Sequence, residues 1–171
     1  MISKKMQDAF NNQINAELYS AYLYFSMQAY FEELNLKGFA NWMGVQVQEE
    51  LAHAEKFTNF VNERGGRVVP KTIECPPIDW ESPLAAFEAT YIHEQSVSAS
   101  INNLVDIAIE ENDHASKIFL DWFVTEQVEE EASVNDVVQK MKLMKDSPHG
   151  LFMIDRELAQ RTFTPPADAT T

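Results

Sequence analysis

Apolar side chains recur every three to four positions along four long stretches of the chain, which is the spacing of the buried face of an α-helix. The breaks between the predicted helices fall near residues 34–38, at 65–81, near 111–113 and near 145, and a short fifth helix ends near 161. Ser82-Pro83 and Ser147-Pro148 each place a capping side chain before a proline, which marks a helix start. The pattern therefore predicts four long helices of about 28 to 32 residues and a short fifth, with no strands.

The connection at residues 67–81 decides how these helices are arranged. It contains Pro70, Pro76 and Pro77 and cannot be helical. Its roughly 15 residues can stretch to about 50 Å, just over the length of one long helix. We therefore predict two antiparallel hairpins joined by an external crossover, an all-α four-helix bundle with a short C-terminal helix. The domain is expected to occupy residues 1–162, followed by a flexible tail at 163–171.

Polar side chains interrupt the apolar stripe of every long helix near its middle. They are Glu17 in the first helix, Glu50 and His53 in the second, Glu94 in the third, and Gln127 and Glu130 in the fourth. Each of the four glutamates lies within about three residues of its helix midpoint, or roughly 5 Å along the axis. Packing the helices side by side should therefore bring all of these groups into one layer.

Such a layer needs a cation. The stripes that carry the acids also carry core aromatic and aliphatic residues, which argues against a solvated face, and none of the stripes carries Lys or Arg. Burying an unpaired carboxylate costs several kcal/mol, so four together would exceed the stability of a typical domain. Two divalent ions would balance four carboxylates, and mixed carboxylate and imidazole ligation suits iron, manganese or zinc.

Charge and composition narrow the function further. The formal net charge is −14, from 27 acidic and 13 basic residues, which disfavours nucleic acid as a partner and favours metal cations. No apolar run reaches the roughly 18 residues of a membrane span, and no signal peptide is evident. A single cysteine, Cys75, excludes an intrachain disulfide. We expect a cytoplasmic protein that contacts neither nucleic acid nor membrane.

The set Glu50-x-x-His53 with Glu17, Glu94, Gln127 and Glu130 resembles the ferroxidase centre of ferritins, specifically the haem-free bacterial and archaeal type. The Glu-x-x-His motif on facing helices is an established feature of ferritin-like carboxylate proteins. The resemblance covers nearly the whole chain. It implies a ferritin-like fold, oxidation of Fe(II) by O₂ or peroxide, and storage as a ferric mineral inside a homo-oligomeric shell of 24 subunits.

The resemblance also implies roles for individual residues. Glu17, Glu50 and His53 would bind one iron, Glu50 would bridge to a second iron held by Glu94 and Glu130, and Gln127 would lie close by. Glu49, Glu126 and Glu129 resemble a third iron site. Tyr24, two turns from Glu17, would take part in electron transfer, whereas we expect Trp122 to be a core residue. Leu51 stands where a haem-ligating Met would be expected, so we predict no haem.

Several other interpretations compete. A di-iron oxidase or peroxidase related to rubrerythrins would use the same layer without storage, although the single Cys75 excludes a rubredoxin-like module. A helical interaction module would carry the acids by accident and bind no metal. A mini-ferritin that guards DNA would place its ligands between subunits. His93 and His114 lie off the stripes, where we expect surface or contact residues.

Overall fold

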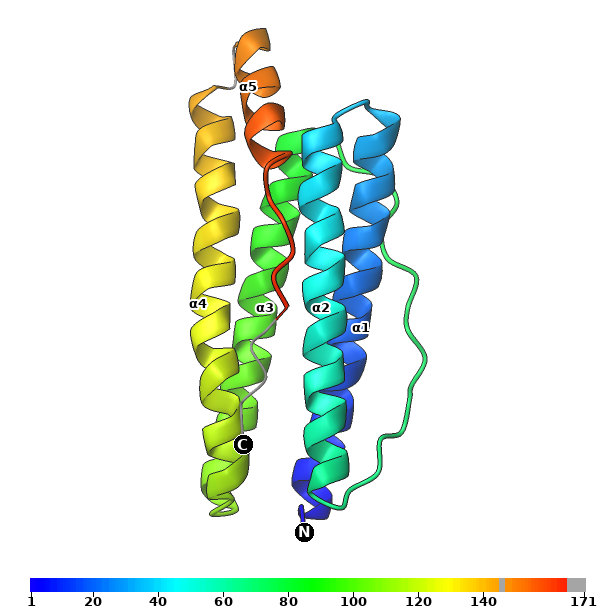
Figure 1. Ribbon diagram of the computed structural model, residues 1–171, viewed down its shortest axis with the longest axis vertical. Helices are drawn as coiled ribbons and strands as arrows, with labels where there is room; N and C mark the ends of the chain where they lie inside the picture. Colours follow the sequence, from blue (N-terminus) through cyan, green and yellow to red (C-terminus); the bar gives the residue numbers. More distant parts are fainter. Residues whose placement is uncertain (145–146, 166–171) are drawn as a thin grey trace.

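The computed structural model describes residues 1–144 and 147–165, and in these residues it contains helices and no strand (Figure 1). The helices are α1 (Lys4–Glu33), α2 (Lys37–Glu63), α3 (Pro83–Glu110), α4 (His114–Leu143) and α5 (Pro148–Leu158). This confirms the all-α prediction of four long helices and a short fifth. Within the same residues, none of the helices combines the length and the hydropathy needed to cross a bilayer.

The helices start and end where local chemistry directs them. Four starts are capped by a side-chain oxygen that accepts from the backbone N–H three residues on, at 3.1–3.2 Å: Ser3, Ser82, Asp113 and Ser147. Three ends pass through a left-handed residue: Asn35 (φ 57°), Gly65 (φ 71°) and Asn112 (φ 55°). After each of these, the next N–H bonds back into the last helical turn, at 2.8–3.0 Å. The predicted breaks near residues 34–38, at 65–81 and near 111–113 are therefore confirmed.

The predicted ends of the last two helices differ from the structure by two to three residues. α4 ends at Leu143, two residues before the predicted end near 145, a position that lies outside the described residues. α5 ends at Leu158 and not near residue 161. The amide of Asn41 in α2 donates to the carbonyls of Leu158 (3.1 Å) and Arg161 (2.9 Å), which draws the chain away from the helix axis. The predicted tail begins just beyond, and its residues 166–171 also lie outside the described part.

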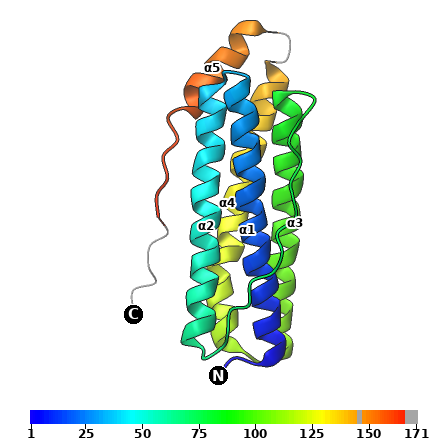
Figure 2. The same cartoon turned by 90° about the vertical axis from the view of Figure 1, so that its right-hand side faces the viewer.

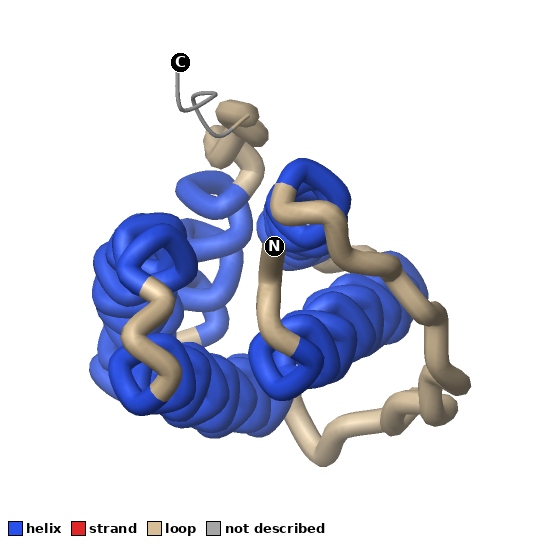
Figure 3. Tube along the Cα trace, turned by 90° about the horizontal axis from the view of Figure 1, so that it is seen from below, coloured by secondary structure: helices blue, strands red, loops and turns tan. Residues whose placement is uncertain are grey.

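The long helices pack as two hairpins, α1 on α2 and α3 on α4, with further contact between α1 and α3. Figures 1 and 2 show the connection between α2 and α3 running the length of the bundle along the outside of α1. Side chains of α1 hold it there. Val69 N–H donates to Asn11 Oδ1 at 2.8 Å, and Tyr30 donates to the carbonyl of Trp80 at 3.1 Å. Figure 3, seen along the bundle from below, shows the same connection outside the helices. The predicted external crossover is therefore present.

The apolar core is divided into two clusters along the bundle axis. One lies toward the α5 end and includes Phe31, Phe39 and Phe87. The other lies toward the N-terminal end of α1 and includes Phe10 and Phe57. Between the two clusters, the buried faces of all four long helices carry polar side chains. The fold therefore supports a polar layer from both sides with tightly packed aromatic residues.

α5 docks against the start of α2, where no side chain of α2 itself caps the helix. Asp155 of α5 supplies the cap instead, because its Oδ1 accepts from the backbone N–H groups of Gly38 (2.7 Å) and Phe39 (3.2 Å). The approach is so close that a Cβ added at Gly38 would lie 1.6 Å from the Asp155 carbonyl oxygen. Ile154 and Leu158 complete the contact by packing into the core cluster at the α5 end of the bundle.

Candidate metal centre

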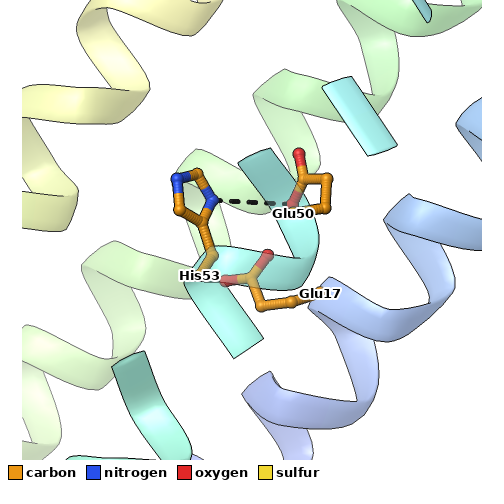
Figure 4. A group of neighbouring side chains, drawn as sticks. All are labelled: Glu17, Glu50 and His53. Atoms are coloured by element: carbon orange, nitrogen blue, oxygen red, sulfur yellow. Dashed lines mark ion pairs between the residues drawn. The ribbon is translucent and has the colours of Figure 1, made fainter. Parts of the chain in front are cut away.

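Glu17, Glu50 and His53 form the most compact group of ligand-type side chains in the described part of the chain. One ligand atom of each lies within 4.8 Å of the others. Glu17 reaches in from α1, whereas Glu50 and His53 stand one turn apart on α2, as Figure 4 shows. His53 Nδ1 lies 3.6 Å from Glu50 Oε2, and each side chain is at most 3% exposed. The sequence prediction that these three residues converge is confirmed.

Glu94 of α3 and Glu130 of α4 are buried at the other side of the layer. Tyr24 donates a hydrogen bond to Glu94 Oε1, and the amide of Gln127 donates to Glu94 Oε2 at 3.1 Å. The amide of Gln46 donates to Glu130 Oε2 at 3.1 Å. The four helices therefore contribute to one polar layer in which Tyr24 and the two glutamines orient the carboxylates.

Several acceptor oxygens in this layer have no donor among the described residues. They are Oε2 of Glu17, Oε2 of Glu50 and Oε1 of Gln46. A buried acceptor without a donor is costly, because it has lost water and gained nothing in exchange. Protons shared between carboxylates or metal cations would satisfy these oxygens. The donor set, carboxylate oxygens with one imidazole, fits first-row transition metals such as iron.

Burial and mutual repulsion hold the protons on these acids when no metal is bound. Burial, followed by the charge of Glu50, raises the pKa of Glu17 to about 8. Burial, followed by the charge of Glu94, raises the pKa of Glu130 to about 7. The pKa values of Glu50 and Glu94 are also raised, chiefly by burial. A divalent cation entering the layer would therefore displace protons.

The predicted third group is more open than the buried polar layer. Glu49 and Glu126 are partly buried and Glu129 is exposed. The pKa of Glu49 is raised to about 7, chiefly by burial; the charge of Arg161 lowers it, and the charges of Glu130 and Glu126 add to the increase. Glu49 and Glu126 therefore lie close enough to repel each other, but the three carboxylates do not converge as tightly as the first group. Their role as metal ligands stays a prediction.

Sequence reasoning missed residues that support the layer. Gln13 is buried; its amide donates to Glu17 Oε1 at 3.0 Å, and its oxygen accepts from Ser100 Oγ at 2.5 Å. Gln46 holds Glu130 in the same way, and it lies one helical turn before Glu50 on α2. Gln13 stands one turn before Glu17, and this spacing was the available signal.

Two residues given minor roles in the sequence analysis contact the layer. His93 is a contact residue: its ring meets the Tyr24 ring at 5.9 Å, and its Nε2 lies 2.7 Å from Ser20 Oγ. Burial lowers the pKa of His93 to about 4, so its ring is neutral at pH 7. Trp122 packs edge-on against His53, with ring centroids 5.5 Å apart. Trp122 is thus a packing residue, as expected, and it limits how the His53 ring can turn.

Comparison with known proteins agrees with this geometry. The family model described as "Ferritin-like domain" matches residues 7–144. A bacterial non-heme ferritin of Bacteroides fragilis is 46% identical over 161 residues, covering 94% of this chain and 100% of the relative. One of Staphylococcus aureus is 36% identical over 163 residues, covering 95% and 98%. The crystal structure of an open pore ferritin from Archaeoglobus fulgidus superposes with a TM-score of 0.94 at 54% identity, covering 95% of this chain and 100% of that chain.

Proposed function

Because this chain belongs to the ferritin family, we propose that it oxidises Fe²⁺ at the polar layer and stores the product as a ferric mineral inside a shell of identical subunits. The observation that carries the proposal is the set of four buried carboxylates in one layer, in which Glu17 and Glu50 each have an oxygen without a donor among the described residues. Neither a protein–protein contact nor a purely structural role accounts for that cost. Two divalent ions would remove it.

Two ions can be assigned to the side chains of the layer. We assign the first to Glu17, Glu50 and His53, and the second to Glu94 and Glu130, with Glu50 bridging and Gln127 close by. Each pair of carboxylates balances one divalent charge, so Fe²⁺ enters without leaving a buried net charge. The protons that hold Glu17 and Glu130 in the metal-free protein leave as the ions bind.

The reaction balances as a two-electron step. Each of two Fe²⁺ ions gives one electron. One O₂ accepts both electrons with two protons to form hydrogen peroxide, or one hydrogen peroxide accepts both with two protons to form two water molecules. The two ions gain one positive charge each, which the surrounding carboxylates stabilise. Tyr24 donates a hydrogen bond to Glu94, so it would orient this ligand and would take part in electron transfer. The aromatic clusters on either side keep bulk water out of the layer.

The proposal also covers the third group of carboxylates and the assembly of identical subunits. Glu49, Glu126 and Glu129 would hold a third iron, and we expect no haem because Leu51 replaces the ligating Met. Large apolar side chains remain exposed on the single chain, among them Phe25, Ile92, Ile118, Val128, Phe152 and Met153. Where such side chains gather into a contiguous patch, the patch is typical of a subunit contact. We propose a homo-oligomer of 24 subunits.

An aerobic loading series tests the proposal. Purified protein receives increasing Fe²⁺ and is then separated by size while iron and protein are detected together. Iron far beyond the few ions that the acidic sites can hold should co-elute with a large assembly. Glu50→Gln and His53→Ala should slow the oxidation, whereas Glu33→Gln, an exposed change at the end of α1, should not. If binding stops at two or three ions per chain while oxidation continues, the protein is a di-iron oxidase without storage. If no metal binds, the helical interaction module is the better description.

A further inference from the structure

The segment that follows α5 brings a cation to the flank of the metal layer. Figure 1 shows this segment, in red, running back beside α2. Arg161, three residues after the end of α5, lies with Nη2 2.7 Å from Oε2 of Glu49. Glu49 is one of the carboxylates that we assign to the third iron site. The guanidinium therefore occupies a position where a metal ion would otherwise approach Glu49.

Arg161 is held in place by more than this ion pair. Its guanidinium lies over the ring of Trp42, 4.4 Å from the ring centroid, and Nη1 donates to the Trp42 carbonyl at 3.4 Å. Its own carbonyl accepts from Asn41 at 2.9 Å. The side chains of Arg161 and Glu49 are only 21% and 18% exposed. A stacked, hydrogen-bonded and partly buried arginine is far better ordered than a typical surface ion pair.

Without Arg161, negative charge would be in excess around Glu49 on this flank of the layer. Glu49 lies near Glu126 and Glu130, and their negative charges add to one another. Arg161 is the basic residue that the described structure pairs with Glu49, and its charge also acts on Glu130 at the edge of the di-iron layer. It thus supplies part of the positive charge that a third metal ion would bring.

We propose that Arg161 is a built-in competitor for metal at the third carboxylate site. The guanidinium and an incoming Fe²⁺ compete for Glu49, so binding of the third ion requires that Arg161 give up this contact. The third site therefore binds iron more weakly than the di-iron layer does. Binding at the di-iron layer does not require Arg161 to move. This inference rests on the proposed function, because it takes Glu49 as a ligand.

The test is an anaerobic equilibrium titration of the assembled protein with Fe²⁺, comparing wild type, Arg161→Gln and Arg156→Gln. Arg156 is exposed on α5, so its variant loses the same charge away from the acids. Arg161→Gln should tighten the third, weakest class of ions by on the order of tenfold, since a hydrogen bond to a charged group no longer has to be broken. The affinity of the two tighter ions should change far less, because Arg161 pairs with Glu49 and acts on Glu130 only through its charge, and Arg156→Gln should leave all classes unchanged.

Two results would overturn the inference. An unchanged third-ion affinity in Arg161→Gln would mean that the arginine does not compete. A weaker third ion would mean that it orients Glu49 as a ligand. If Arg161→Gln fails to assemble, Arg161→Lys serves instead: its ammonium keeps the charge but cannot stack as a planar group, and the third ion should tighten less. If the wild-type protein does not bind the two tight ions at all, the proposed function itself is refuted. A failure of the proposed function can therefore be told apart from a failure of this inference.

Discussion

Replacing Glu17 with glutamine should stabilise the metal-free protein while impairing its metal centre. In the folded chain Glu17 is 1% exposed, faces Glu50, and leaves Oε2 without a donor among the described residues. A glutamine has nearly the same shape and can still accept the hydrogen bond from Gln13. Its amide can also donate toward Glu50. The substitution thus exchanges repulsion for a hydrogen bond.

The size and pH dependence of the effect follow from the pKa of Glu17. Its pKa rises from 4.5 to about 8 on folding, chiefly through burial. Between these values the folded chain binds more protons than the unfolded chain, so stability falls as pH rises through the window. Above pH 8 the full penalty is about 5 kcal/mol, at about 1.4 kcal/mol per pH unit, and at pH 5 it is about 1 kcal/mol. Local rearrangement reduces the penalty, so we expect a gain of about 2–5 kcal/mol at pH 9.

Thermal unfolding with a chelator present measures this gain. Glu17→Gln should raise the melting temperature by about 5–15 °C at pH 9 and by much less at pH 5, given roughly 2–4 °C per kcal/mol for a chain of this size. Glu33→Gln, exposed at the end of α1, is the matched control and should change neither value. Adding Zn²⁺ at about 100 times its dissociation constant should stabilise wild type by about 2.7 kcal/mol per site and the variant by less. A shift equal at both pH values, or a lower melting temperature at pH 9, would refute the reasoning.

Three further predictions follow from the geometry. Gly38→Ala should displace α5 and lower the melting temperature, because the new Cβ would collide with the Asp155 carbonyl; Gly44→Ala meets only a flexible side chain and should be milder. Tyr24→Phe removes a donor to Glu94, so it should destabilise the metal-free protein by about 1–3 kcal/mol and slow iron oxidation followed by absorbance; an unchanged oxidation rate would remove Tyr24 from the reaction. Calorimetric titration with Zn²⁺ in buffers of different ionisation enthalpy should detect more protons released at pH 6 than at pH 9, and equal release would contradict the raised pKa values of the layer.

Much of the fold was predictable because its determinants are local. The helix ends depend on short capping sequences and on asparagine or glycine in the left-handed region, as at Asn35 and Asn112. The central acids were predictable for a different reason. Their positions repeat at helical spacing, and Glu17 and Glu50 each lie near the middle of a helix, so side-by-side packing alone brings them together.

The support around the acids could not be predicted in the same way, because it depends on contacts between distant segments. Gln46 could have faced any neighbour on its stripe, and only the packed bundle shows that it donates to Glu130. The helical pattern could not predict the contact made by Arg161. This residue lies after the last helix, and it contacts Glu49 because the chain leaves α5 at Leu158.

The division of the core explains how the chain tolerates so costly a layer. Aromatic clusters above and below it, such as Phe31 with Phe87 and Phe10 with Phe57, pack the same four helices together on both sides. Burying a large apolar side chain contributes about 1.5–3 kcal/mol, so the clusters can hold the carboxylates close even when no metal offsets their repulsion. A preformed layer binds metal without first ordering the helices. The repulsion between the buried acids is therefore tolerated because the aromatic clusters pack tightly on both sides of it. Glu17→Gln should reduce this repulsion without changing the packing of the clusters.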